Sequence, residues 1–169
     1  IMLRYYEKTF GDFLETYDYN HGNEELPKSE YSDCIWVCWW QGLEQAPEIV
    51  KICVESIKKN AGDHRVIILT DDNYKQYVDI PEWVEEKKNK GIISRTHYSD
   101  ILRLALLAQH GGMWIDSTFY CTDNVLDDYF KWPLWSIKRP DYFHASIASG
   151  YFANYSFACT QENRWVFQT

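Results

Sequence analysis

The sequence lacks the signatures of several common classes of enzyme. It contains no G-x-S-x-G, no P-loop and no G-x-G-x-x-G motif, so a serine hydrolase, a P-loop enzyme and a dinucleotide dehydrogenase lose their usual support. Its five histidines have neither H-x-x-x-H nor H-E-x-x-H spacing, which removes the usual sign of a zinc site. No apolar run approaches the ~20 residues of a membrane span, and no signal peptide begins the chain. We therefore expect no membrane span.

Positive charge is also scarce. The chain has 17 Lys and Arg against 25 Asp and Glu, a net charge of −8 and a pI of about 5.1. Proteins that bind the phosphate backbone of nucleic acids usually present a concentrated basic surface, so no nucleic-acid partner is expected. A small anionic ligand is still allowed, because it needs only one Arg or Lys, backbone N–H groups or a cation in a local pocket.

Cysteine occurs without paired C-x-x-C motifs. The five cysteines form an odd set, and several lie inside apolar runs, which favours small core residues in a reduced, cytoplasmic setting. A location at the inner face of the membrane stays compatible with this. The chain begins at Ile1 and ends at Thr169 without a helix-ending signal, so we expect a fragment that lacks a C-terminal part.

Apolar and aromatic residues are abundant. The 169 residues are 46% hydrophobic, enough for one domain with a sizeable core. Aromatic residues make up 17%, including 13 Tyr and 8 Trp. Flat rings with a polar tip suit sugars and nucleotide bases, but an aromatic-rich core explains the excess equally well.

The order of the expected elements predicts an α/β fold. An amphipathic helix over 3–17 and a polar connection over 21–32 precede a buried strand over 35–40. A helix after Pro47, with Ile49, Ile52, Cys53 and Ile57 on one stripe, and a strand over 66–70 complete a right-handed βαβ unit. Helices over 81–90 and 98–110 follow, then strands over 113–115, 119–121 and 134–137, while 151–159 is ambiguous. The prediction is a mostly parallel central sheet flanked by helices.

Polar residues gather at the ends of these strands. Thr70-Asp71-Asp72 follows one strand and Asp116-Ser117-Thr118 another, while Asp100 lies in the first turn of its helix. Ligands of open α/β sheets bind beyond the carboxyl ends of the strands. These residues are therefore the candidate binding site.

Each candidate also has a structural interpretation. Asp100 and Arg103 could form an ordinary i,i+3 ion pair, and Asp116 could begin a turn. Asp71 and Asp72 suit a turn or helix cap, and Trp36 could belong to the core. The pair Gly111-Gly112 would be needed structurally in either case.

The spacing Ser99-Asp100-x-x-Arg103-x-x-x-Leu107-x-x-x-Gly111-Gly112-x-Trp114-x-Asp116 resembles a known signature. It is similar to that of the sugar-transferase family of capsular polysaccharide synthesis proteins, initiating mannosyltransferases and glucosylating bacterial toxins. Ile35-Trp36 and Ile67-Ile68-Leu69-Thr70-Asp71 fit the same pattern, and the resemblance covers roughly 33–125. It implies a Rossmann-like type-A glycosyltransferase fold. The expected nucleotide-sugar-binding domain spans 35–169 and follows the helix and linker that the residue pattern predicts over 1–34.

The resemblance also implies roles for individual residues. Asp100 and Arg103 would contact the donor sugar and phosphate, and Asp116 the ribose or sugar hydroxyls. Trp36 would stack on the base, with Thr70, Asp71, Gly112, Ser117 and Thr118 completing the donor-binding set. Many relatives have Asp-x-Asp, whose last carboxylate binds Mn²⁺ or Mg²⁺, but this chain has Thr118 there. Asp116 is the candidate metal ligand, and Thr118, with only a neutral hydroxyl, predicts weaker binding of Mn²⁺ or Mg²⁺.

Two functions from different classes follow. The first is a retaining transferase that moves a hexose from a nucleotide-diphosphate sugar to a glycan or lipid-linked acceptor in capsular or surface polysaccharide synthesis. The second is a non-catalytic module that binds a sugar nucleotide or glycan within a polysaccharide-assembly system. A glycoside hydrolase is less favoured, because no second carboxylate is evidently paired with Asp116.

Overall fold

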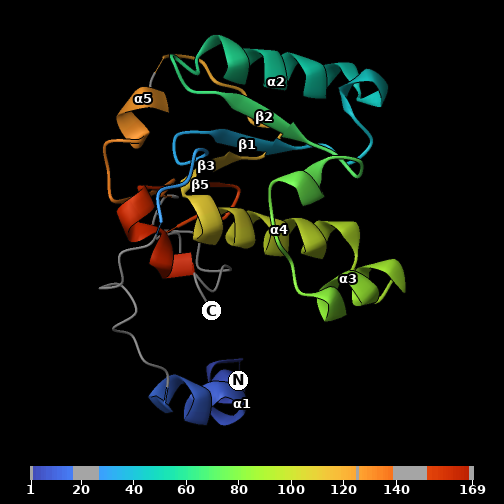
Figure 1. Ribbon diagram of the computed structural model, residues 1–169, viewed down its shortest axis with the longest axis vertical. Helices are drawn as coiled ribbons and strands as arrows, with labels where there is room; N and C mark the ends of the chain where they lie inside the picture. The colour runs from blue at the N-terminus through green and yellow to red at the C-terminus, as the bar shows by residue number, and fades with distance from the viewer. Residues whose placement is uncertain (1, 17–26, 125, 139–151, 168–169) are drawn as a thin grey trace.

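The computed structural model describes residues 2–16, 27–124, 126–138 and 152–167 (Figure 1). Its helices are α1 (Met2–Thr16), α2 (Glu48–Lys59), α3 (Glu82–Asn89), α4 (Arg95–His110) and α5 (Leu126–Tyr129). Its strands are β1 (Ile35–Cys38), β2 (Val66–Leu69), β3 (Gly112–Ile115), β4 (Leu134–Ser136) and β5 (Ser156–Cys159). The 3-10 helices are η2 (Leu43–Gln45), η3 (Tyr74–Gln76) and η4 (Gln161–Phe167). None of the described helices is long and apolar enough to cross a membrane.

The five described strands form one sheet in the order β2-β1-β3-β5-β4. β1 lies between β2 and β3 and is parallel to both, with Trp36 opposite Ile67 and Trp114. β5 is antiparallel to β3 and to β4. The α/β prediction is confirmed, and the sheet is mixed, with its parallel part at β2, β1 and β3.

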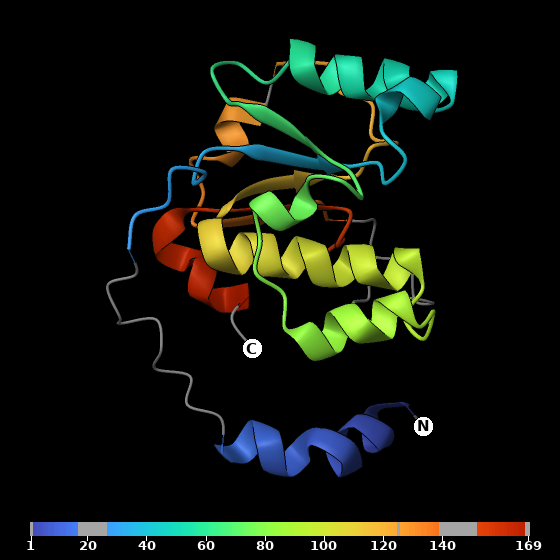
Figure 2. The same cartoon turned by 45° about the vertical axis from the view of Figure 1, so that its right-hand side comes forward.

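Helices cover both faces of the sheet (Figures 1 and 2). Alternation along each strand divides the core into two clusters. Trp36, Leu69 and Trp114 pack with Leu102 and Leu106 of α4. On the opposite face, a second cluster joins strands β1 and β3 to α2 and α5; its members include Ile35, Val37, Met113, Ile115, Val50, Val54, Ile57 and Leu126. The buried strand predicted over 35–40 is confirmed for 35–37; β1 ends at Cys38, and Cys38 and Trp39 are only partly buried.

Several sequence predictions need correction. Residues 119–121 form no strand, because the Cys121 N–H and C=O bond to the hydroxyl of Ser56 in α2 and to the side-chain amide of Asn60, which follows α2. The buried stripe of α2 contains Cys53 and Ile57 as expected, but Ile49 and Ile52 are exposed and Val50 and Val54 are buried instead. The part of the 21–32 connection that is described lies against the domain: the Ser29 hydroxyl and His110 Nδ1 are 2.6 Å apart. Residues 21–26 lie outside the described ones.

Two glycines join α4 to β3. Gly111 ends the helix and donates its N–H to the carbonyl of Leu107. Gly112 begins β3 at a φ of +85°, and a Cβ there would lie 2.5 Å from the carbonyl oxygen of Cys34. A side chain is excluded by both strain and contact. These glycines let β3 run beside β1 and deliver Asp116 just beyond its end.

Candidate functional site

A cavity of about 580 Å³ opens beyond the carboxyl ends of β1 and β3. This volume lies within the range of small-molecule sites. The first turns of α4 form one wall, and residues next to β5 form another. Its lining residues are Cys38, Trp39, Trp40, Gln41, Arg95, Thr96, Ser99, Asp100, Arg103, Trp114, Asp116, Ser117, Thr118, Asn154 and Tyr155.

We call Asp100, Arg103 and Asp116 the acidic corner of this cavity. Arg103 of α4 donates from Nη1 to Asp100 Oδ1 at 2.7 Å and from Nη2 to Asp116 Oδ1 at 3.1 Å. Its side chain is only 5% exposed, whereas those of Asp100 and Asp116 are 43% and 38% exposed. The guanidinium carbon also lies 5.0 Å from the ring centre of Trp114. The arginine is thus fixed inside the protein, and both carboxylates reach the cavity.

Among the described residues, each of the two carboxylates accepts hydrogen bonds through only one of its two oxygen atoms. Asp116 Oδ1 also accepts from Trp114 Nε1 at 2.7 Å, and Asp100 Oδ1 also accepts from Asn154 Nδ2 at 3.1 Å. Among the described residues, every hydrogen bond to these two side chains ends on Oδ1. The Oδ2 atoms keep their capacity to accept hydrogen bonds from a ligand.

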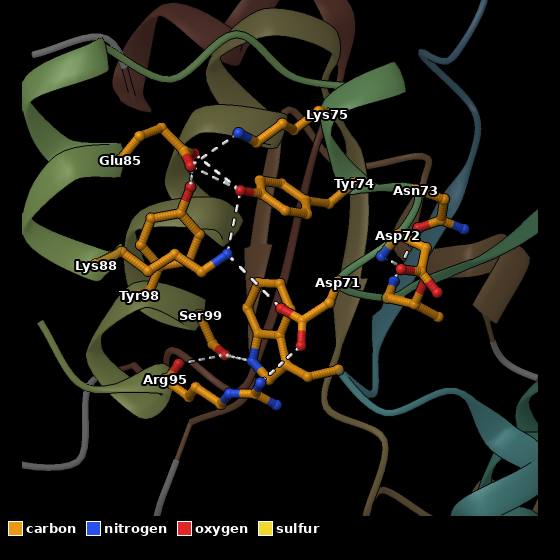
Figure 3. Close-up of polar contacts among 12 residues, drawn as sticks. Asp71, Asp72, Asn73, Tyr74, Lys75, Glu85, Lys88, Arg95, Tyr98 and Ser99 are labelled. Carbon is orange, nitrogen blue, oxygen red and sulfur yellow. Dashed lines mark hydrogen bonds and ion pairs between the residues drawn. The ribbon is translucent and has the colours of Figure 1, made fainter. Parts of the chain in front are cut away.

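We call Arg95, Asp71 and Lys88 the basic corner, drawn in Figure 3. Asp71 Oδ2 lies 2.8 Å from Arg95 Nη2, and Asp71 Oδ1 lies 3.7 Å from Lys88 Nζ. Lys88 is 14% exposed, and its Nζ lies 4.9, 4.3 and 4.4 Å from the ring centres of Trp40, Tyr74 and Tyr98. Arg95 itself is 55% exposed and lines the cavity.

A hydrogen-bond network around Glu85 adjoins the basic corner, because Lys88 Nζ also donates to the hydroxyl of Tyr74 at 3.1 Å. Glu85 of α3 accepts hydrogen bonds from the hydroxyls of Tyr74 and Tyr98, and Lys75 Nζ lies 3.2 Å from it. Burial raises the pKa of Glu85, but these hydrogen bonds and Lys75 lower it by more, so its pKa is below the ordinary value. Burial and the bond to Glu85 raise the pKa of Tyr98. The network ties α3 to η3 and to the first turn of α4.

Five of the predicted site residues line the cavity together: Asp100, Arg103, Asp116, Ser117 and Thr118. Asp71 does not line it, but it is ion-paired with Arg95, which does. Thr70 lies in the turn after β2, where its hydroxyl accepts from the N–H of Asp72. The turn interpretation of 70–72 therefore holds, with the ion pairs of Asp71 added to it.

Two predicted donor-binding residues belong to the core. Trp36 is fully buried, its ring lies among those of Tyr31, Tyr77 and His110, and its Nε1 donates to the carbonyl of Gly111. No face of its ring is open to a base, so the stacking role predicted for Trp36 is wrong. Gly112 is equally buried and does not line the cavity.

The sequence analysis missed other residues of the cavity. Trp39 and Trp40 follow β1 directly, and Trp40 Nε1 donates to Ser99 Oγ at 2.9 Å. Because the cavity lies beyond the end of β1, the last tryptophans of the run reach it and the first does not. Arg95 was missed because α4 was predicted to begin at 98. Ser94, whose hydroxyl accepts from the N–H of His97, is a helix cap that could have revealed the earlier start.

Neither a thiolate nor a preformed metal cluster is found here. Burial, with the charges of Asp71 and Asp116, raises the pKa of Cys38 to about 12, which keeps the thiol neutral near pH 7. Among the described residues, no three His, Cys, Asp or Glu side chains are grouped to hold a metal ion. The cavity therefore presents carboxylates, hydroxyls, indoles and one accessible guanidinium.

Comparison with known proteins gives one match. The family model described as capsular polysaccharide synthesis protein matches residues 1–169. No curated protein and no solved structure matches the chain. The match agrees with the resemblance carried by the 99–116 spacing and covers the whole sequence. The chain belongs to the capsular polysaccharide synthesis protein family.

Proposed function

We propose that the chain binds a nucleotide-diphosphate sugar in this cavity and is a hexosyltransferase of capsule synthesis, with a Rossmann-like type-A fold. The observation that carries the proposal is the meeting of Asp100, Arg103 and Asp116 around one cavity, although they come from two elements. The family membership supports a role in capsular polysaccharide synthesis. The acceptor would be a glycan or a lipid-linked saccharide, used on the cytoplasmic side.

The proposed chemistry rests on position and charge. The Oδ2 atoms of Asp100 and Asp116 would accept hydrogen bonds from hydroxyls of the donor. Trp39, which lines the cavity with a partly exposed ring, would replace Trp36 as the surface for the base. Cleavage of the bond between the anomeric carbon and the diphosphate needs stabilisation of the charge that develops on the leaving group. In this proposal, a cationic side chain at the cavity and backbone N–H groups supply that stabilisation.

Mn²⁺ or Mg²⁺ fits this site only in part. Hard cations prefer oxygen ligands, and Asp100 and Asp116 each have one carboxylate oxygen without a protein donor among the described residues. Thr118 adds only a hydroxyl. We propose that a cation, where used, is held chiefly by Asp116.

A donor-binding module without turnover is the second candidate. The observation in its favour is Thr118, which lines the cavity where many relatives have a metal-binding carboxylate. Such a module would use the same residues to bind a sugar nucleotide within a polysaccharide-assembly system.

Titration with a panel of nucleotide sugars, with and without Mn²⁺, tests both candidates. Binding followed by slow release of nucleotide supports the transferase, and binding without release supports the module. Asp116→Asn is the decisive variant: its amide oxygen can keep the contacts with Arg103 and Trp114, while its NH₂ turns the acceptor in the cavity into a donor. We expect donor binding to weaken about 10-fold or more while the variant stays folded.

Asp123→Asn, in an exposed loop outside the cavity, is the matched control and should bind as the parent does. If the parent binds no nucleotide sugar, or if Asp116→Asn binds every donor as well as the parent, the proposed function is wrong.

A further inference from the structure

We propose that the diphosphate of the donor binds at the basic corner, with Arg95 as its ligand, while the sugar hydroxyls bind at the acidic corner. This inference rests on the proposed function and gives the donor a direction within the cavity. It also separates Arg103 from the phosphate role that the family resemblance implied for it. Three observations carry it: the charge balance of the two corners, the access to each arginine, and the position of Arg95 on its helix.

The two corners have opposite charge balance. At the acidic corner one guanidinium faces two carboxylates, which leaves a net charge of −1. At the basic corner two cations share Asp71, which leaves a net charge of +1. The neighbouring Lys75 and Glu85 cancel one another. A diphosphate placed at the acidic corner would face a net like charge, whereas at the basic corner it meets an opposite one.

The two arginines also differ in access. Both Nη atoms of Arg103 bond to carboxylates, and its Nε is buried with no partner among the described residues. The guanidinium of Arg103 is therefore occupied by contacts within the protein. Arg95 pairs with Asp71 through Nη2, and its side chain is 55% exposed at the cavity wall. The remaining donors of its guanidinium can bind phosphate oxygens.

Arg95 lies at a place on α4 that favours an anion. It is the first residue of this 16-residue helix, and Thr96, the next, also lines the cavity. The first N–H groups of a helix have no partner within it, and the helix dipole is positive there. The first turn thus adds to the charge of Arg95, and the hydroxyl of Thr96 adds a further donor.

Arg95→Gln tests the inference by isothermal titration. The probes are UDP, GDP, ADP and CDP, together with the nucleoside of whichever diphosphate the parent binds most tightly. We expect Arg95→Gln to bind that diphosphate about 10- to 100-fold more weakly, with the affinity for the nucleoside changed less than about 2-fold. Arg95→Lys, which keeps the charge, should recover part of the loss. Arg4→Gln, an exposed arginine on α1, is the matched control.

The outcomes separate this inference from the proposed function. Unchanged diphosphate binding by Arg95→Gln would overturn the inference and leave the function standing. An equal loss for diphosphate and nucleoside would also overturn it, because a general change of the cavity would then explain both. A parent that binds none of the four diphosphates would remove the proposed function and this inference together.

Discussion

The two corners of the cavity contain the same kinds of group in opposite proportions. At the acidic corner a buried arginine is enclosed by two partly exposed carboxylates. At the basic corner one carboxylate is shared by a buried lysine and a largely exposed arginine. In the first the cation is structural and the acids face the cavity. In the second the acid is structural and a cation faces the cavity.

This comparison shows that a sequence motif of charged residues does not by itself reveal which of its side chains is exposed enough to bind a ligand. Asp100 and Arg103 are three residues apart on α4, yet one is 43% exposed and the other 5%. Because a buried guanidinium needs its partners to offset desolvation, Arg103 spends its hydrogen bonds within the protein. The acids beside it gain fixed positions in return.

The largest effect that we expect separates the two arginines by stability. Arg103→Leu removes the shared partner of Asp100 and Asp116 and leaves their carboxylates facing one another, so unfolding should require roughly 2–4 kcal/mol less. Arg95→Leu breaks an exposed pair and should cost under about 1 kcal/mol. Chemical denaturation of both variants measures the contrast. Equal losses would contradict the distinction between the corners.

An intermediate effect is expected from making the acidic corner more acidic. Thr118→Asp adds a third carboxylate beside Asp116, and should strengthen the binding of Mn²⁺ by on the order of tenfold. Thr122→Asp, in an exposed position outside the cavity, is the matched control. Titration of both variants with Mn²⁺ decides the matter: if the two gain equally, the charge of the chain and not this corner attracts the ion.

The smallest effect concerns the network behind the basic corner. The pKa of Glu85 in the folded protein is below its ordinary value of 4.5. Its contribution to stability is therefore full above this value and is lost as the pH falls through the lower folded pKa. Between about pH 5 and pH 3, the parent should lose about 1–3 °C more in melting temperature than Glu85→Gln does. Parallel acid sensitivity of the two proteins would show that Glu85 adds nothing.

Regular patterns were the part of this fold that the sequence could predict. The apolar runs of β1 and β2, the helices between β1 and β3 and the grouping of Asp100, Arg103 and Asp116 all depend on local periodicity or fixed spacing. β5 was ambiguous because its residues, Ser156–Cys159, are buried on both faces and lack alternation. The short helix α5 contains only four residues, too few for a helical period.

The misassigned residues depend on tertiary contacts. Trp36 and Trp39 stand in one apolar run, and only the position of the strand end decides which of them reaches the cavity. Ile52 looked as suitable for the core as Val54, but α2 turns Val54 to the sheet. Arg95 was missed because its helix was predicted to begin at 98, and its place at the cavity depends on how the first turn of α4 packs beside the ends of the strands.

The absence of a side chain at Gly112 has a consequence for the whole site. The carbonyl of Cys34 occupies the space that a methyl group would need, so β3 is locked to β1 at one register. A slip of one position would turn every side chain of β3 to the opposite layer. Asp116 would then face α2 and leave Arg103 with a single counter-charge. The missing side chain at Gly112 thus lets β3 keep the position that places Asp116 at the cavity.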